Sequence, residues 1–153
     1  MDCKYVIPGG NPTIAHDYIL NDSDKSYTVP ADEIWELYAV SLELVATATA
    51  GNRSLRVTIT DGSNMLWTSY PSANIAANTA GQLLVNTNGS REATARVYMV
   101  TPTATVASSV CDGQLPRGLR LLPGSVIRAY DSAAIDAAAD DLRVVLFYIA
   151  YQL

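Results

Sequence analysis

The stretch that decides the fold is the C-terminal third, which reads LPRGLRLLPGSVIRAYD over residues 115–131 and DLRVVLFYI over residues 141–149. Pro123 and Gly124 form a turn signal between two strand-like runs, and a loop of alanine, serine and aspartate precedes the third run. That last run is apolar at consecutive positions, so both faces of the predicted strand are apolar. One face packs in the core of a two-layer protein, and the other face must be covered by another molecule.

The second apolar face predicts that the chain associates with copies of itself. The predicted contacts between copies lie on one face of the last strand, at Val145, Phe147, Ile149 and Tyr151. The opposite face carries Leu142, Val144, Leu146 and Tyr148. Because both sets are apolar, the sequence leaves open which of them faces the core.

Composition narrows the class of protein. The chain has 153 residues, of which 49% are hydrophobic and 16% charged, with a net charge of −5. This length predicts a single domain with its own core. The acidic balance repels phosphate groups, so we expect no nucleic-acid partner. No window reaches the roughly 18 apolar residues of a membrane span, and the N-terminus lacks a secretory signal, so we expect no membrane contact and synthesis in the cytoplasm.

Strand signals recur along the chain, whereas helix signals are scarce. About eight or nine short strands in one domain predict an all-β fold, an antiparallel β-sandwich, and among sandwiches a jelly roll. The jelly roll is favoured because the first long strand follows an N-terminal extension and another long strand ends the chain, which suits neighbouring central strands. The predicted strands before the C-terminal third cover residues 16–20, 26–29, 34–45, 54–60, 65–68, 82–86 and 93–100, with a weaker signal at 103–110.

The first fifteen residues differ from the rest. Pro8, Gly9, Gly10 and Pro12 interrupt any strand or helix pattern there. We therefore predict an N-terminal arm over residues 1–15 and a single β-sandwich domain over residues 16–153. Arms of this kind commonly become ordered only against a neighbouring molecule.

No group of residues makes a persuasive catalytic, metal or cofactor site. His16 and Asp17 are adjacent, and adjacent side chains on a strand point to opposite faces, which disfavours a catalytic triad. Cys3 and Cys111 lack a neighbouring histidine or cysteine, so free thiols are expected.

Calcium could be bound by Asp131, Asp136, Asp140 and Asp141, or by Asp22 and Asp24, although aspartates in such loops more often cap turns. Glycosidase carboxylates could come from Glu33, Glu36 and Glu43, although nothing sets their separation. We expect no enzyme activity, no metal and no cofactor.

Two segments carry a resemblance to a known family. Residues 29–62 contain VPADEIW, then GNR before LRVTITDG, and residues 115–153 contain LLPGSVIRAYDSAAID. Both are similar to small virion structural proteins of tailed bacteriophages. The resemblance implies a capsid decoration (cement) protein, which is a β-sandwich that forms a trimer on the capsid surface where major capsid proteins meet. Two alternatives remain open: a head-tail or tail-fibre module, and a jelly roll that binds a carbohydrate or a receptor.

The expected partners are therefore copies of the chain itself, as a homotrimer, and the major capsid protein. Few charges and an acidic balance predict that the contact with the shell depends on apolar and hydrogen-bonded surface and on the N-terminal arm. The predicted shell contacts are Tyr5, Val6, Ile7 and Ile14.

Overall fold

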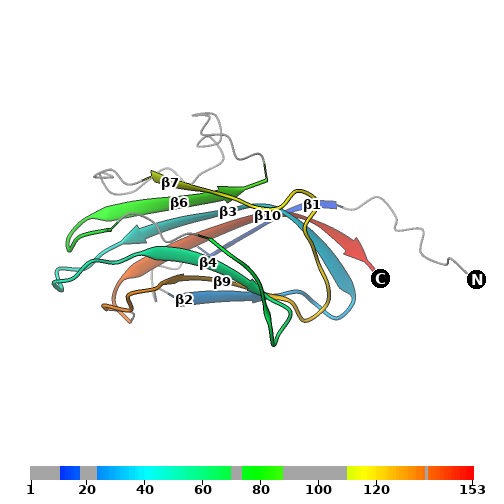
Figure 1. Ribbon diagram of the computed structural model, residues 1–153, viewed down its shortest axis with the longest axis horizontal. Helices are drawn as coiled ribbons and strands as arrows, with labels where there is room; N and C mark the ends of the chain where they lie inside the picture. The colour runs from blue at the N-terminus through cyan, green and yellow to red at the C-terminus, as the bar shows by residue number, and fades with distance from the viewer. Residues whose placement is uncertain (1–10, 18–23, 70–73, 88–109, 137) are drawn as a thin grey trace, which may run out of the picture.

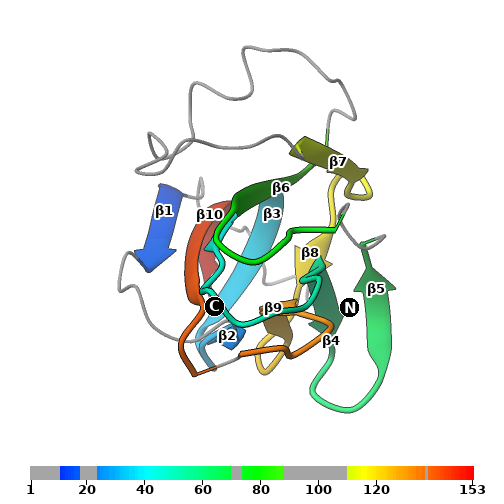
Figure 2. The same cartoon turned by 90° about the vertical axis from the view of Figure 1, so that its left-hand side faces the viewer.

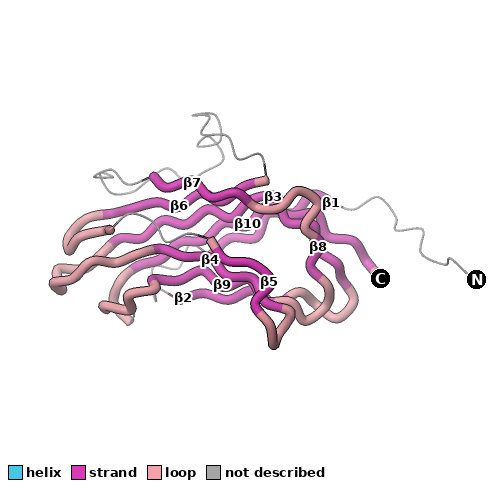
Figure 3. The backbone as a smooth tube through the Cα atoms, viewed as in Figure 1, coloured by secondary structure: helices cyan, strands magenta, loops and turns pink. Residues whose placement is uncertain are grey.

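The computed structural model describes residues 11–17, 24–69, 74–87, 110–136 and 138–153, with the backbone alone for residues 11–17 and 110–113. These residues contain strands and connecting turns and no helix (Figure 3). The strands are β1 (Asn11–Asp17), β2 (Asp24–Thr28), β3 (Glu33–Val45), β4 (Leu55–Thr60), β5 (Met65–Thr68), β6 (Ala80–Asn86), β7 (Val110–Gln114), β8 (Arg120–Leu121), β9 (Val126–Asp131) and β10 (Asp141–Gln152).

The strands form two facing sheets. The larger sheet has the order β1-β10-β3-β6-β7, with β8 paired to the beginning of β3, and the smaller sheet has the order β2-β9-β4-β5. Figure 2 shows the larger sheet curving over the smaller one. The chain changes sheet at each step from β1 to β4, forms the β4–β5 hairpin, returns at β6, and crosses again at β9 and β10. This double Greek key is the connectivity of a jelly roll, so the predicted all-β class, the sandwich and the jelly-roll topology are confirmed.

The core lies between the sheets and is built by alternation along the long strands. In β10 the side chains of Leu142, Val144, Leu146 and Tyr148 belong to the core cluster. In β3 the core side chains include Trp35, Leu37, Val40, Leu42 and Leu44. The two strands pair along most of their lengths in the middle of the larger sheet, as expected for the first and last long strands. The face of β10 that carries Val145 is therefore the outer face.

The Pro-Gly turn also forms as its sequence predicts. The N–H of Ser125 donates to the carbonyl of Leu122 at 3.0 Å, which closes a four-residue turn. Gly124 has φ = +82°, a conformation that favours glycine in the third position of a type II turn, and Pro123 suits the second position. The turn leads the chain from β8 in the larger sheet to β9 in the smaller one.

Two predictions need correction. The sheet begins at Asn11, so residues 11–15 belong to β1 and pair with β10 instead of forming part of an arm. Pairing with an already extended neighbour satisfies their backbone groups in spite of Pro12. In addition, β7 runs parallel to β6, so the sandwich is not wholly antiparallel. The long connection between them allows this direction. Residues 93–100, where a strand was predicted, lie outside the described residues, and β6 pairs with β3 and β7.

The sandwich has two distinct ends, which Figure 1 shows on its right and left. The turn end consists of residues 29–33, 61–64 and 122–125 and the C-terminal Leu153. Backbone hydrogen bonds join Val29 to Gly124 and Ser125, and Leu153 to Asp32, at 2.8–3.0 Å. The loop end consists of residues 46–54, 132–136 and 138–140. Because β3 runs from one end to the other over 13 residues, the ends are roughly 40 Å apart.

Candidate functional site

The predicted contact face of β10 lies on the outside of the larger sheet. Val145 is only 3% exposed, so it is already covered within the chain. Phe147, Ile149 and Tyr151 are partly exposed and continue along the same face toward the turn end. Three of the four predicted side chains are thus accessible to a partner molecule. Association between copies stays a prediction.

An irregularity in the pairing of β3 with β10 adds an aromatic side chain to this face. Phe147 pairs with Ala39 and Tyr148 pairs with Leu37, which leaves Tyr38 as an extra residue in β3. Since Leu37 and Val40 are both fully buried in the core, Tyr38 and Ala39 lie consecutively on the outer side. A β-bulge of this kind re-aims a side chain out of the regular alternation. Here it leaves Glu36 and Tyr38 together on the outer face, whereas Val40 and Leu42, which follow at the same two-residue spacing, lie in the core.

Glu36 is the centre of a polar cluster on the outer face. The hydroxyl of Tyr38 donates to Oε1 of Glu36 at 2.9 Å, and the hydroxyl of Tyr151 donates to Oε2 at 3.1 Å. The hydrogen bond to Glu36 raises the pKa of Tyr38, with burial as a smaller cause. Burial raises the pKa of Tyr151, and its bond to Glu36 adds to the effect. Both phenols therefore remain protonated donors, and each oxygen of the carboxylate has a partner within the chain.

Arg120 in β8 completes the cluster. Its Nε lies 3.6 Å from Oε2 of Glu36, and its guanidinium carbon lies 5.7 Å from the ring centre of Tyr151. The first contact is an ion pair too long for a good hydrogen bond. Within the described part of the chain Arg120 donates no hydrogen bond, and its side chain is 55% exposed. Among the described residues its guanidinium therefore has only this long ion pair and the contact with the Tyr151 ring, and its exposed N–H groups can reach a partner molecule. We call Glu36, Tyr38, Arg120 and Tyr151 the outer cluster.

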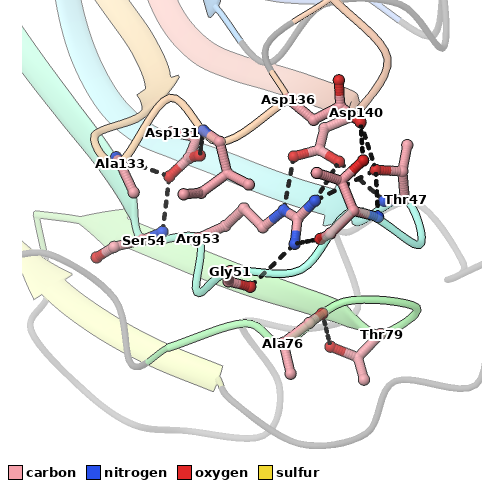
Figure 4. A network of polar contacts seen from close by, with 12 residues as sticks. Thr47, Gly51, Arg53, Ser54, Ala76, Thr79, Asp131, Ala133, Asp136 and Asp140 are labelled. Atoms are coloured by element: carbon pink, nitrogen blue, oxygen red, sulfur yellow. Dashed lines mark hydrogen bonds and ion pairs between the residues drawn. The ribbon is translucent and has the colours of Figure 1, made fainter.

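A second polar network holds the loop end together (Figure 4). Arg53 is fully buried, and its guanidinium forms two hydrogen bonds of 2.8 and 3.1 Å with the carboxylate of Asp140. It also donates to the carbonyls of Thr49 and Gly51 at 2.7 and 3.0 Å. The hydrogen bond to Asp140 raises the pKa of Arg53. One side chain thus ties the loop after β3 to the loop before β10, which is a structural role.

The aspartates considered as calcium ligands bind neighbouring donors instead. Asp131 accepts backbone N–H bonds from Ser54 and Ala133 at 2.7 and 3.0 Å. Asp136 accepts the hydroxyls of Thr47 and Thr49, both at 2.7 Å, and these bonds lower its pKa. In β2, Asp24 forms an ion pair with Arg128. Among the described residues no cluster of three or more histidines, cysteines or acidic residues could hold a metal ion.

The candidate glycosidase carboxylates do not come together. Alternation places Glu33 and Glu36 on opposite faces of β3. Glu33 instead accepts hydrogen bonds from Trp35 Nε1 at 2.5 Å and from Gln152 at 2.9 Å. Glu43 lies seven residues beyond Glu36 in the same strand, roughly 23 Å away. The structure shows no shared position for a sugar between any two of them.

Other predicted positions are only partly covered by the structure. Tyr5, Val6 and Ile7, with Cys3 and Asp22, lie outside the described residues. Ile14 lies in β1, in register with Phe147, and His16 is in register with Val145. Cys111 lies in β7. Sequence reasoning did not find the outer cluster, because the bulge that brings in Tyr38 leaves no signal in the periodicity.

Comparisons with known proteins do not assign the chain to a family. No protein-family model matches the chain, and no curated protein is significantly similar to it. A solved structure titled "Structure of infectious bursal disease virus Gx strain" contains a chain with 14% identity and a TM-score of 0.28. The match covers 99% of the present chain and 44% of that chain, so the present chain spans less than half its length. A TM-score this low has no bearing on function.

The described residues contain no helix long and apolar enough to cross a membrane.

Proposed function

We propose that the protein is a capsid decoration (cement) protein of a tailed bacteriophage, which associates with itself as a trimer and binds the assembled head shell. The proposal makes the protein a structural component of the virion surface. Its partners are then two more copies of this chain and the major capsid protein.

The observation that carries the proposal is the outer face of β10. This strand lies between β1 and β3, and it has a complete core face and a second face with Phe147, Ile149 and Tyr151. A solvated outer face of an antiparallel sheet normally alternates to polar residues. Large partly exposed apolar and aromatic side chains there support a contact with another protein. The resemblance of residues 29–62 and 115–153 to phage virion proteins supports the same role.

A cement protein works through its shape and its contact area and needs no catalytic residues. A protein that binds only the assembled shell stabilises that shell by mass action. The two polar groupings described above fit this role, since one surrounds Glu36 on a sheet face and the other ties two loops together. Neither one brings a nucleophile to a general base within the described residues.

One observation favours a second candidate, a carbohydrate-binding jelly roll. The outer cluster combines two tyrosine rings with a carboxylate and a guanidinium, which are groups that can stack on a sugar ring and bond its hydroxyls. Mass spectrometry of purified particles separates the candidates: a decoration protein is expected in hundreds of copies, whereas a head-tail or fibre module is expected in a dozen or fewer. A glycan-binding protein unrelated to virions would be absent.

The first test concerns association. Replacing Ile149 or Phe147 with aspartate should dissociate the oligomer while the chain stays folded, because a charge would be buried between copies without a partner. Light scattering measures the mass, and circular dichroism checks the fold. Thr60→Asp on the smaller sheet is the matched control and should leave the mass unchanged. A wild-type protein that is monomeric at tens of micromolar would contradict self-association.

The second test concerns the shell. Particles made without the protein should keep their shape but release DNA at a lower temperature than complete particles, because the contacts it adds exist only in the assembled state. A thermal release curve measures the difference, and adding purified protein back should restore the original curve. Identical curves with and without the protein would remove the stabilising function.

A further inference from the structure

The large apolar side chains that the described surface exposes are unevenly distributed between the two ends. Met65, Leu66, Leu122 and Leu153 are each 52–63% exposed. Leu122 and Leu153 belong to the turn end, and Met65 and Leu66 follow directly after its 61–64 turn. The loop end has Ile135, at 36% exposure. Exposed apolar groups that gather in one region mark an interaction site more often than scattered ones do.

Contacts between the turns show that these groups share one region. The N–H of Gly124 donates to the carbonyl of Val29 at 3.0 Å. A Cβ placed on Gly62 would lie 3.4 Å from the carbonyl oxygen of Gly124, so the 61–64 turn touches the 122–125 turn. The backbone N–H of Leu153 donates to Asp32 at 2.8 Å. Figure 1 shows the C-terminus and these turns at the same end.

The outer cluster borders this region. Arg120 and Leu121 form β8, which leads directly into Leu122, and Tyr151 lies two residues before Leu153. Tyrosine and arginine are the side chains most often found at the energetic centre of protein interfaces. Because each oxygen of Glu36 already accepts a tyrosine hydroxyl, the tyrosines are held in place before any partner arrives. Fixed side chains lose less entropy when they bind.

We propose that the turn end, with the outer cluster at its border, is the surface that docks on the shell, and that Arg120 binds a carboxylate of the shell protein. This proposal rests on the proposed function and deepens it by naming the docking surface. A guanidinium with free N–H groups matches a carboxylate in charge and in its forked geometry. The loop end then faces away from the shell.

The size of the region favours the shell over a second copy as its occupant. The four large apolar side chains that define the region, those of Met65, Leu66, Leu122 and Leu153, are far fewer than the roughly 20–30 residues a side of a stable complex of two proteins. A small contact suffices when an oligomer binds several equivalent sites of a shell at once, because the later contacts form at high effective concentration. The rest of the outer face of β10, with Phe147 and Ile149, remains for contacts between copies.

The test measures binding of purified protein to particles made without it, by titration and sedimentation. Leu122→Ser and the double change Met65→Ser with Leu66→Ser should each weaken binding at least about tenfold, and so should Arg120→Ala. Ile135→Ser is the apolar control at the loop end. Arg128→Ala is the arginine control, because Arg128 is also about half exposed beside a tyrosine ring. Both controls should bind within about twofold of wild type.

Each outcome has a definite meaning. Full binding by every turn-end variant would overturn the docking surface while leaving the decoration function intact. Loss of the oligomer in those variants, seen by light scattering, would assign the surface to contacts between copies and overturn the proposal as well. Failure of the wild-type protein to bind any particle would reject the decoration function, and the docking surface with it. Normal oligomer mass with weakened binding would support the proposal.

Discussion

Replacing Arg53 with methionine is expected to destabilise the protein by about 3–5 kcal/mol, because it leaves the carboxylate of Asp140 buried without its counter-charge. Both side chains of this ion pair are fully buried. The change also removes the bonds to the carbonyls of Thr49 and Gly51. Urea unfolding followed by tryptophan fluorescence measures the free energy of unfolding.

Two further variants separate the buried charge from other effects. Arg128→Met breaks a chemically similar pair with Asp24, but its side chains are 47% and 44% exposed, so a loss below about 1 kcal/mol is expected. Arg53→Met combined with Asp140→Leu removes both charges and should recover part of the loss. If Arg53→Met cost no more than Arg128→Met, the loop end would not depend on this ion pair.

The sequence was sufficient to predict the main sheet architecture. The long runs that became β3 and β10 are rich enough in apolar and aromatic residues to be recognised as strands, and their positions near the start of the domain and at its end predicted that they would be neighbours. The turn at Pro123 and Gly124 formed as its residues require. The strand and turn predictions succeeded because they depend on residues close together in the sequence, whereas the pairing of β3 with β10 followed from the order of the strands in a jelly roll.

Features that depend on distant residues could not be predicted. The bond between Tyr151 and Glu36 joins positions 115 residues apart, and that between Arg53 and Asp140 joins positions 87 residues apart. Tyr38 reaches the outer face only because the register of β3 and β10 shifts at one point. The two apolar faces of β10 were equivalent in the sequence, and pairing across the sandwich decided which one entered the core.

The parallel strand β7 was missed for a related reason. The weak strand signal at residues 103–110 overlaps β7 only at Val110, and the rest of β7 reads Cys-Asp-Gly-Gln, which has no strand pattern and no indication of direction. Strand direction depends on how the chain returns to the sheet after β6, which is a property of the whole topology. The boundary of the N-terminal arm was placed too late because proline and glycine signals outweighed the pairing that β10 offers to residues 11–17.

Replacing Trp35 with alanine is expected to cost about 3–5 kcal/mol of stability, the usual range for removing a buried aromatic side chain. Trp35 is 6% exposed and belongs to the core cluster. Its ring stacks on Tyr148 with centres 4.1 Å apart, so the change removes contacts between the two central strands of the larger sheet. Chemical denaturation followed by circular dichroism gives the difference.

Two matched variants test this explanation of the loss. Trp35→Phe keeps an aromatic ring beside Tyr148 but loses the indole N–H bond to Glu33, so a smaller loss of about 1 kcal/mol or slightly more is expected. Trp67→Ala changes a partly buried tryptophan in the edge strand β5 and should cost less than Trp35→Ala. An equal or larger stability loss in Trp67→Ala would place the critical packing in the smaller sheet, contrary to the central role assigned here to β3 and β10.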